Sequence, residues 1–110
     1  MDKINFDNMS HKEIEDRYIK YEIPYHYQFQ NAEQVEKVFG WDFCTIIGMD
    51  DLSVDDKLQA EKFICAFLNT YSLWYRHKHK PVSIEKLRTC YKLTTIDGEY
   101  SYLYFNGEIG

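Results

Sequence analysis

Features that often identify the class of a protein are scarce in this chain of 110 residues. Its three cysteines, Cys44, Cys65 and Cys90, lie far apart and form no Cys-x-x-Cys or Cys/His ligand spacing. That pattern argues against a disulfide framework and against the usual zinc sites. All three lie in apolar segments, so we expect reduced, buried cysteines that pack in the core.

The sequence also has no recognisable signal for targeting or for spanning a membrane. The first ten residues, MDKINFDNMS, do not resemble a secretory signal peptide. No apolar run reaches the roughly 18 residues that a membrane-spanning helix needs. We therefore expect a cytoplasmic protein without a membrane partner.

Catalytic motifs are absent as well. The sequence has no glycine-rich phosphate loop, no Gly-x-Ser-x-Gly elbow and no His-Glu-x-x-His pair. His77 and His79 are two residues apart, which places them on different sides of a helix, whereas zinc-binding helices use a spacing of four. We interpret them as a solvated helix end. The sequence predicts a protein that is not an enzyme and that uses no metal ion and no cofactor.

The strongest pattern in the chain is a periodic apolar stripe from Ser53 to Lys80. Apolar residues recur there every three or four positions, which predicts one long amphipathic helix. Ser53 and Asp56 have the spacing of a capping box at its start. Pro81 disfavours helical geometry at the residue before it and is expected to end the helix.

Two shorter helices are predicted ahead of this stripe. Residues 10–21 open with Ser-His-Lys-Glu, a capping-box sequence, and Pro24 is expected to end the first helix. Residues 31–39 follow, with an asparagine at the N-cap and Gly40 at the left-handed C-terminal position. Residues 1–9 are expected to form a loosely held arm.

The remaining elements are predicted to be strands. Residues 41–47 (WDFCTII) are β-branched and aromatic between two glycines, which is typical of a buried strand. Residues 90–96 and 99–105 flank Asp97-Gly98, which favours a hairpin with a two-residue type I′ turn. That register places six side chains on one face: Tyr91, Leu93, Thr95, Tyr100, Tyr102 and Tyr104.

Together these elements predict one α+β domain over residues 1–110. It has two short N-terminal helices, one strand, a long central amphipathic helix and a C-terminal β-hairpin in a small antiparallel sheet. We expect strand 41–47 to join the hairpin, because an isolated hairpin is marginally stable in water. Residues 82–87 are ambiguous between one turn of helix and a strand.

Four carboxylates stand close together at the start of the predicted long helix: Asp50, Asp51, Asp55 and Asp56. Capping and the helix dipole account for Asp55 and Asp56, but not for Asp50 and Asp51. The cluster lacks the bend glycine and the closing glutamate of a calcium loop. Helix capping is therefore the first interpretation, and an acidic contact surface that imitates a phosphate backbone is the second.

Basic residues gather in a belt over residues 76–92 of an otherwise acidic chain with a net charge of −5. The belt consists of Arg76, Lys78, Lys80, Lys86, Arg88 and Lys92. Beside a tyrosine-rich face, such cations can follow the phosphates of a single strand while the rings stack on its bases. The acidic overall charge and the lack of an RNP-like motif weigh against this interpretation.

Residues 61–69 (EKFICAFLN) resemble a helix of the small acidic phage-borne anti-CRISPR proteins that inhibit type II CRISPR nucleases. The order of elements departs from that inhibitor, in which a sheet precedes a helical C-terminal half. No functional residue carries over from these nine positions. The resemblance implies a small intracellular protein without an active site that binds a nuclease surface, often where nucleic acid would lie.

The sequence therefore predicts a non-enzymatic inhibitor whose partner is another protein, one that handles nucleic acid. The expected contact residues are Asp50, Asp51, Asp55, Asp56, Tyr100, Tyr102 and Tyr104. Two alternatives stay open: a nucleic-acid-binding module that uses the basic belt and the tyrosine face, and an immunity-type protein that caps a toxin. The sequence does not identify the partner or the oligomeric state.

Overall fold

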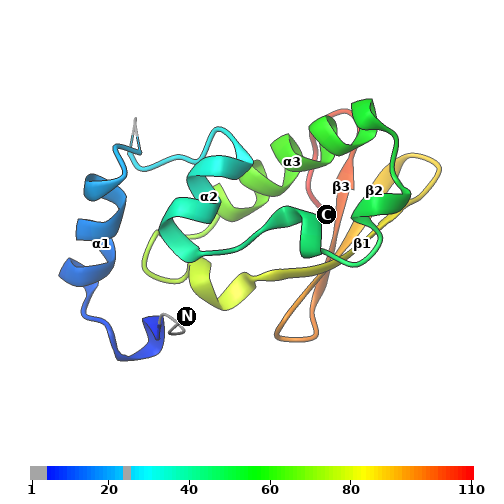
Figure 1. Ribbon diagram of the computed structural model, residues 1–110. Coiled ribbons are helices and arrows are strands. Elements are labelled where there is room, and N and C mark those ends of the chain that lie inside the picture. The colour runs from blue at the N-terminus through cyan, green and yellow to red at the C-terminus, as the bar shows by residue number, and fades with distance from the viewer. Residues whose placement is uncertain (1–4, 24–25) are drawn as a thin grey trace.

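A computed structural model describes residues 5–23 and 26–110 of the chain (Figure 1). Within these residues it has three α-helices and one three-stranded antiparallel sheet, so the predicted α+β class is confirmed. The helices are α1 (His11–Lys20), α2 (Ala32–Phe39) and α3 (Val54–Asn69). The strands are β1 (Pro81–Lys86), β2 (Cys90–Thr95) and β3 (Tyr100–Tyr104), in that spatial order. The finer layout differs from the prediction in several places.

The two N-terminal helices begin where the sequence predicts. Ser10 Oγ accepts a hydrogen bond from the backbone N–H of Glu13 at 3.1 Å, and the Glu13 carboxylate accepts one from Ser10 N–H at 3.4 Å. This reciprocal pair is the predicted capping box. Asn31 caps α2 through the N–H of Gln34 at 2.9 Å, and Gly40 ends α2 in the left-handed region at φ 74°.

The segment ahead of α1 contributes to the core. Residues 6–8 form a short 3₁₀ helix, η1 (Phe6–Asn8), and the Phe6 ring packs edge-on against Phe39 with 5.1 Å between centroids. The buried Phe6 side chain therefore fixes residues 5–9 of the expected loose arm to the core. Residues 1–4 lie outside the described part of the chain, as does Pro24, which was expected to end α1.

The predicted helix over residues 53–80 is wrong at its C-terminal end, because α3 ends at Asn69. The Asn69 side chain pairs with the backbone of Phe29, accepting its N–H at 2.8 Å and donating to its carbonyl at 2.9 Å. The Thr70 hydroxyl donates to the Phe67 carbonyl at 2.6 Å. Such side-chain bonds compete with the helical pattern. The chain then turns into a 3₁₀ helix, η4 (Arg76–His79), before β1.

The predicted strand at residues 41–47 is also wrong, because a 3₁₀ helix, η2 (Phe43–Thr45), lies in its middle. The Asp42 side chain accepts the N–H of Cys44 at 2.9 Å, and the Thr45 hydroxyl donates to the Asp42 carbonyl at 2.6 Å. These local bonds favour a turn over an extended strand. Only Ile47 pairs with the sheet, in a parallel bridge to β1. The third strand is the ambiguous stretch after Pro81.

The C-terminal hairpin forms, but its turn and register differ from the prediction. Thr95 N–H donates to the Glu99 carbonyl at 2.9 Å, which leaves a loop of three residues, 96–98. Gly98 has a positive φ of 85° and Asp97 does not, so the turn is not type I′. A turn followed by a left-handed glycine is the usual three-residue hairpin loop. The pairing therefore shifts by one residue, and Lys92 lies opposite Tyr102.

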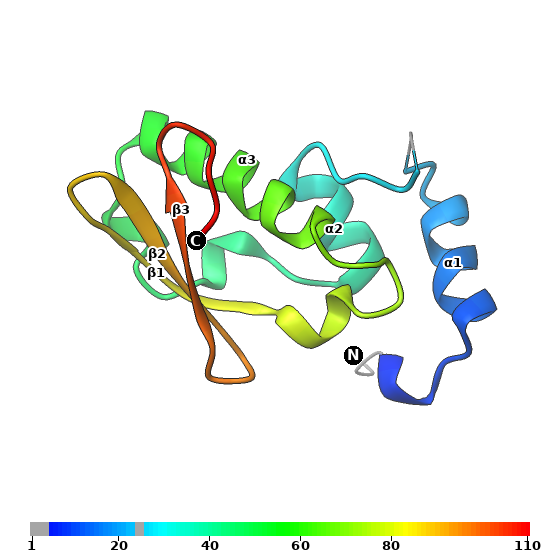
Figure 2. The same ribbon diagram turned by 180° about the vertical axis from the view of Figure 1, so that it is seen from behind.

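That shift separates the six side chains that were expected on one face, because a one-residue slip moves a strand's side chains to the opposite face. Tyr91, Leu93 and Leu103 are buried on the inner face, which packs on α3. The rings of Tyr91 and Phe63 of α3 lie 6.1 Å apart. Tyr100, Tyr102 and Tyr104 lie on the outer face. Figure 2 shows the strands side by side with α3 along them.

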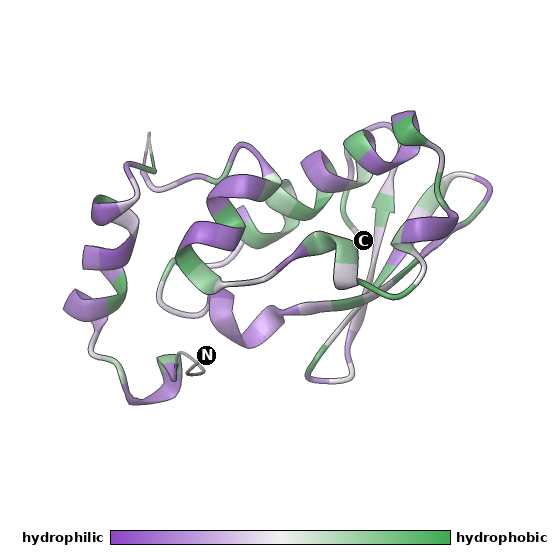
Figure 3. Cartoon of the chain, in the orientation of Figure 1, coloured by the Kyte–Doolittle hydropathy of each residue, from purple (hydrophilic) through white to green (hydrophobic). Residues whose placement is uncertain are grey.

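The core of the molecule joins the sheet to all three helices. Its most deeply buried apolar residues include Ile14 of α1, Val35 of α2, and Ile64 and Leu68 of α3. Hydrophobic and hydrophilic residues alternate around the turns of these helices (Figure 3), as expected for amphipathic helices that bury one side. No helix in residues 5–23 and 26–110 is long and apolar enough to cross a membrane.

Candidate functional site

The outer face of the sheet carries a row of three tyrosines on β3: Tyr100, Tyr102 and Tyr104. We call this row the tyrosine face. Tyr100 is 55% exposed, and the other two are partly exposed. Neighbouring rings lie 5.6 Å and 6.4 Å apart, so they form a continuous aromatic surface. The sequence predicted that these three residues lie together, and the structure brings them together.

Charged side chains border the tyrosine face. Lys92 of β2 shares the outer face, and its Nζ lies 4.7 Å from the centroid of the Tyr100 ring, a cation–π arrangement. Glu85 of β1 is exposed and lies opposite Lys92 in the register of the two strands. The face therefore combines apolar ring area with hydroxyl groups, one cation and one carboxylate. Such a mixture is typical of surfaces that bind other proteins.

Three of the four predicted carboxylates form an exposed acidic cluster: Asp50, Asp51 and Asp55. Asp50 and Asp51 lie in a 3₁₀ helix, η3 (Met49–Asp51), and Asp55 lies in the first turn of α3. None of the three forms an ion pair with another residue of the described chain. Their negative charge is therefore uncompensated within the part of the molecule that the structure describes.

One acid of this cluster, Asp50, acts on Cys44 together with Asp42 and Glu61. The pKa of Cys44 is raised, chiefly by Asp42 and further by Asp50 and Glu61, which disfavour the thiolate. Cys44 is exposed, so the prediction that all three cysteines are buried is wrong for this one. Only Cys65 and Cys90 are buried, and burial raises the pKa of Cys65 to about 12. The neighbouring carboxylates therefore disfavour the thiolate, which is the reactive form of this exposed side chain.

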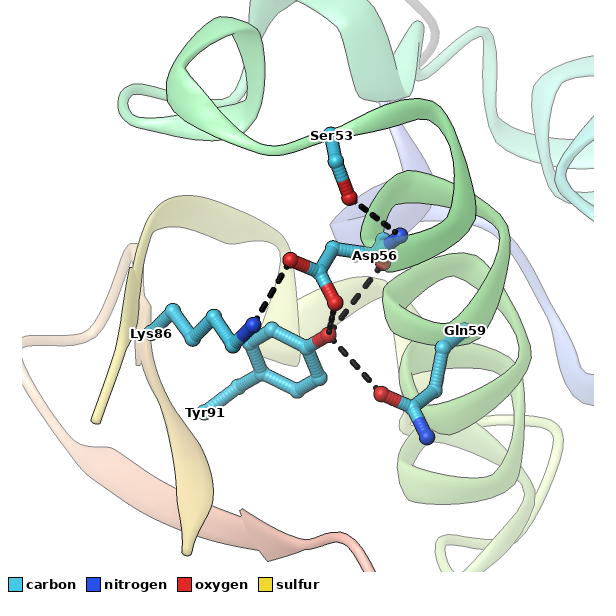
Figure 4. A network of polar contacts seen from close by, with 5 residues as sticks. All are labelled: Ser53, Asp56, Gln59, Lys86 and Tyr91. Atoms are coloured by element: carbon cyan, nitrogen blue, oxygen red, sulfur yellow. Dashed lines mark hydrogen bonds and ion pairs between the residues drawn. The ribbon is translucent and has the colours of Figure 1, made fainter. Parts of the chain in front are cut away.

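The fourth predicted carboxylate, Asp56, belongs to a structural network (Figure 4). Its Oδ2 lies 2.8 Å from Nζ of Lys86, and its Oδ1 lies 3.2 Å from the hydroxyl of Tyr91, which also lies 2.9 Å from Gln59 Oε1. The hydrogen bond from Lys86 lowers the pKa of Asp56. Burial, followed by the contact with Asp56, raises the pKa of Tyr91 to about 12. The network ties the start of α3 to β1 and β2.

This network also explains why the predicted capping box at α3 is only half formed. Ser53 Oγ accepts the N–H of Asp56 at 3.1 Å, as predicted. The Asp56 carboxylate turns to Lys86 and does not return to the N–H of Ser53. Asp56 therefore ties α3 to β1 and β2, whereas the three acids of the acidic cluster have no ion-pair partner among the described residues.

The predicted basic belt is dispersed in the structure. Arg76 is only 2% exposed and lies in the core, Lys86 is paired with Asp56, and Lys92 lies over Tyr100. Arg88 is exposed in the turn between β1 and β2, whereas Lys78 and Lys80 precede the other end of β1. The six basic residues therefore do not form one continuous track for a phosphate backbone.

His77 was interpreted as part of a solvated helix end, and that interpretation is wrong. Its side chain is 9% exposed and stacks on the Phe6 ring with centroids 5.4 Å apart. The indole nitrogen of Trp74 and Nδ1 of His77 are buried with no hydrogen-bond partner among the described residues, and the buried Nε2 of His77 has only Asp7 Oδ1 near it, at 3.4 Å. The basic composition of residues 76–80 hid this burial, because the side chain that covers His77 is Phe6, far away in the sequence.

His77 should make the stability of the protein depend on pH. Burial lowers its pKa below the ordinary value, although Asp7 Oδ1 lies 3.4 Å from Nε2 and opposes the shift, while Lys78 and His79 add to it. The folded state therefore binds fewer protons than the unfolded state, and stability falls as the pH drops below the unfolded pKa of about 6.5.

We expect the free energy of unfolding, measured in urea between pH 7.5 and pH 5, to fall more steeply for wild type than for His77→Phe. Phenylalanine keeps a flat ring against Phe6 but carries no proton to titrate. The carboxylates with lowered pKa, Asp56 and Asp97, are common to both proteins and affect both curves alike. Parallel curves would contradict the assignment of the pH dependence to His77.

Metal binding has no support in the described part of the chain. No group of three or more His, Cys, Asp or Glu residues is placed there to hold a metal ion. The predicted contact residues lie on two exposed surfaces, the acidic cluster and the tyrosine face. Comparisons of the chain with models of protein families, with curated proteins and with solved structures found no match.

Proposed function

We propose that this chain is a non-enzymatic binding protein that inhibits a partner which handles nucleic acid, such as a type II CRISPR nuclease. The observation that carries the proposal is the acidic cluster. Ser53 caps α3 and Lys86 neutralises Asp56, so folding does not need the charges of Asp50 and Asp51. Exposed carboxylates of this kind match a basic groove that otherwise holds phosphates, and they accelerate association with it.

The tyrosine face supports the same proposal from a second surface. Tyrosine is enriched at protein contacts because its ring is apolar and its hydroxyl is polar. The face presents rings on a strand whose other side is held by the buried Leu103. A rigid strand presents these rings with little loss of conformational entropy on binding.

A second candidate function, binding of single-stranded nucleic acid, is favoured by one observation. Lys92 beside Tyr100 places a cation next to exposed rings, and bases stack on such rings while phosphates contact the cation. The burial of Arg76 and the pairing of Lys86 leave fewer cations for this role than the sequence suggested.

The other alternative, an immunity-type protein that caps a toxin, would use the same acidic surface and would differ only in the identity of its partner.

The test is a charge reversal at Asp50 and Asp51. The double variant Asp50→Lys with Asp51→Lys should keep its melting temperature, because both side chains are exposed and unpaired among the described residues. Its affinity for a basic protein partner should fall by about tenfold or more at low salt, mainly through slower association. The control is Glu33→Lys with Glu36→Lys, two exposed acids of α2; because Glu33 is paired with Lys37 at 3.2 Å, the melting temperature of this variant is measured as well. It makes the same change in net charge at another site.

The measurement is capture from a nuclease-treated cell lysate with mass spectrometry, followed by binding kinetics and DNA-cleavage assays on the retained protein. We expect wild type and the α2 control to retain and inhibit the same nucleic-acid-binding enzyme, and the Asp50/Asp51 variant to lose it. Equal loss in both charge reversals would mean that only net charge matters. Direct retention of nucleic acid at low salt by wild type would favour the second candidate function.

A further inference from the structure

The edge of the sheet at β1 is only partly covered by the rest of the chain. β1 is an outer strand, because the spatial order is β1-β2-β3. Ile47 covers the first part of its outer side, since its N–H donates to the Val82 carbonyl at 3.0 Å and its carbonyl accepts the N–H of Ile84 at 2.8 Å. The chain then leaves the edge at Gly48 and enters η3. Within the described residues, the last part of the edge, at Lys86, has no strand beside it on that side.

The backbone N–H of Lys86 points away from the sheet. In an antiparallel pair, successive residues of a strand direct their backbone groups alternately toward the paired strand and away from it. Leu87 N–H donates to the Cys90 carbonyl at 2.7 Å, toward β2, whereas Ile84 N–H faces Ile47 on the outer side. Lys86 lies two positions after Ile84 and is exposed, so its N–H and carbonyl face the outer side too. Unpaired backbone groups at a strand edge are a template for an added strand.

An open groove of about 280 Å³ lies at this part of the edge. It is bounded by β1 and by the segment that runs from Gly48 to the first turn of α3, and Leu52 and Ile84 contribute its apolar lining. An engineered cavity of about 150 Å³ holds one benzene molecule. The groove therefore has room for one large side chain of an added strand.

Acidic side chains outnumber basic ones in the lining of the groove. Asp51, Asp56 and Glu85 line it together with one base, Lys86. Lys86 Nζ lies 2.8 Å from Asp56 Oδ2 (Figure 4), so these two charges offset each other. Asp51 and Glu85 are exposed and form no ion pair with another described residue. The groove therefore favours a segment that carries positive charge.

We propose that this groove binds an extended segment of the inhibited partner protein, which adds an antiparallel strand to β1 at Lys86 and places a lysine or arginine side chain beside Asp51. The residue opposite Lys86 shares its face of the sheet, on the side where Lys86 reaches α3. Backbone hydrogen bonds then supply affinity, and the basic side chain supplies specificity. This inference rests on the proposed function, and it names the chemistry of the partner segment.

Lys86→Pro and Lys86→Ala form a matched pair of variants for the test. Both remove the ion pair with Asp56, but only proline also removes the backbone N–H. Proline is accepted on an edge strand where the N–H faces away from the sheet, so both variants should fold. The probe is the peptide Val-Thr-Arg-Thr-Val, acetylated and amidated at its ends. The control peptide has glutamate in place of arginine.

We expect the arginine peptide to bind wild type and Lys86→Ala with a dissociation constant on the order of 1 mM in NMR titrations, as suits so short a segment. Its binding to Lys86→Pro should be about tenfold weaker, because one backbone donor is lost. The glutamate peptide should bind wild type about tenfold more weakly than the arginine peptide. In wild type, the arginine peptide should slow the exchange of the Lys86 amide hydrogen with solvent.

Three results would overturn the proposal: equal affinities of the proline and alanine variants, equal binding of the two peptides, or unchanged exchange at the Lys86 amide. If Lys86→Pro does not fold, that amide in wild type decides the question, because slower exchange with the arginine peptide supports the added strand and unchanged exchange contradicts it. A dimer in sedimentation whose Lys86 amide is protected without peptide would assign the edge to a second copy of the chain and overturn the proposal.

Failure of this inference can be told apart from failure of the proposed function. If wild type binds no peptide but the Asp50/Asp51 charge reversal still abolishes capture of the partner, only the added strand is overturned. If the arginine peptide binds as expected and the charge reversal leaves capture unchanged, the groove is supported as a site for basic strands and the proposed function is contradicted.

Discussion

Arg76→Ala should lower the free energy of unfolding by about 3–5 kcal/mol, which is a large fraction of the stability of a small domain. The guanidinium of Arg76 donates to the Tyr27 carbonyl at 2.5 Å and to the Tyr71 carbonyl at 3.1 Å. Alanine would leave both carbonyls without these donors and would open a cavity in the core. Urea unfolding followed by far-UV circular dichroism measures the change.

Arg76 is a buried cation that has no ion-pair partner among the described residues, so its charge is compensated in another way. Its guanidinium carbon lies 5.6 Å from the Tyr18 ring centroid and 5.3 Å from that of Phe29. Burial lowers the pKa of Arg76 and raises that of Tyr18, so the tyrosine stays neutral. Ring faces and carbonyl oxygens stabilise the cation here.

Two further variants make the Arg76 prediction specific. Arg76→Lys should also be destabilising, because an ammonium cannot reach two carbonyls in the geometry of a planar guanidinium. Arg88→Ala, at an exposed arginine in the turn between β1 and β2, should change stability by no more than about 0.5 kcal/mol. If the Arg76 and Arg88 variants were equally stable, Arg76 would have to lie on the surface.

Gly48→Ala should destabilise the protein by more than about 3 kcal/mol or prevent folding. Gly48 has a φ of 94°, and a Cβ atom there would lie 2.1 Å from the backbone oxygen of Ile84. Neither atom can move easily, because Ile47, next to Gly48, is hydrogen-bonded to β1 through both its N–H (3.0 Å to the Val82 carbonyl) and its carbonyl (2.8 Å from the Ile84 nitrogen). The clash adds to the strain of a left-handed alanine, which costs about 1–2 kcal/mol.

The matched control is Gly98→Ala in the hairpin turn. Gly98 has a similar φ of 85°, but a Cβ there would meet no atom within 4 Å. That variant should therefore lose only the strain energy of about 1–2 kcal/mol. Thermal unfolding of the two variants separates strain from the steric clash. Equal losses would show that Gly48 does not approach β1 as closely as the structure indicates.

The sequence by itself determined the elements whose causes are local. The starts of all three helices follow from a capping residue and the backbone N–H that it accepts within three positions, as at Ser10, Asn31 and Ser53. The hairpin was located by Asp97-Gly98. The acidic cluster was found because Asp50 and Asp51 precede the Ser53 cap and Asp55 follows it, where exposed carboxylates need no distant partner.

Tertiary structure decided every feature that depends on residues far apart in the chain. α3 ends where Asn69 meets the backbone of Phe29, and Asp56 of the predicted contact surface is paired with Lys86 of β1. His77 is buried against Phe6. None of these partners is within reach of a local sequence pattern.

The hairpin register shows the same division within one element. Asp-Gly is compatible with a two-residue turn and with a three-residue turn that ends in a left-handed glycine, so local sequence leaves both registers open. Burial selects the second, because it places Tyr91 and Leu103 together against α3. The exposure of the tyrosine face follows from that choice. Packing against α3, which the local pattern does not contain, decided which rings face solvent.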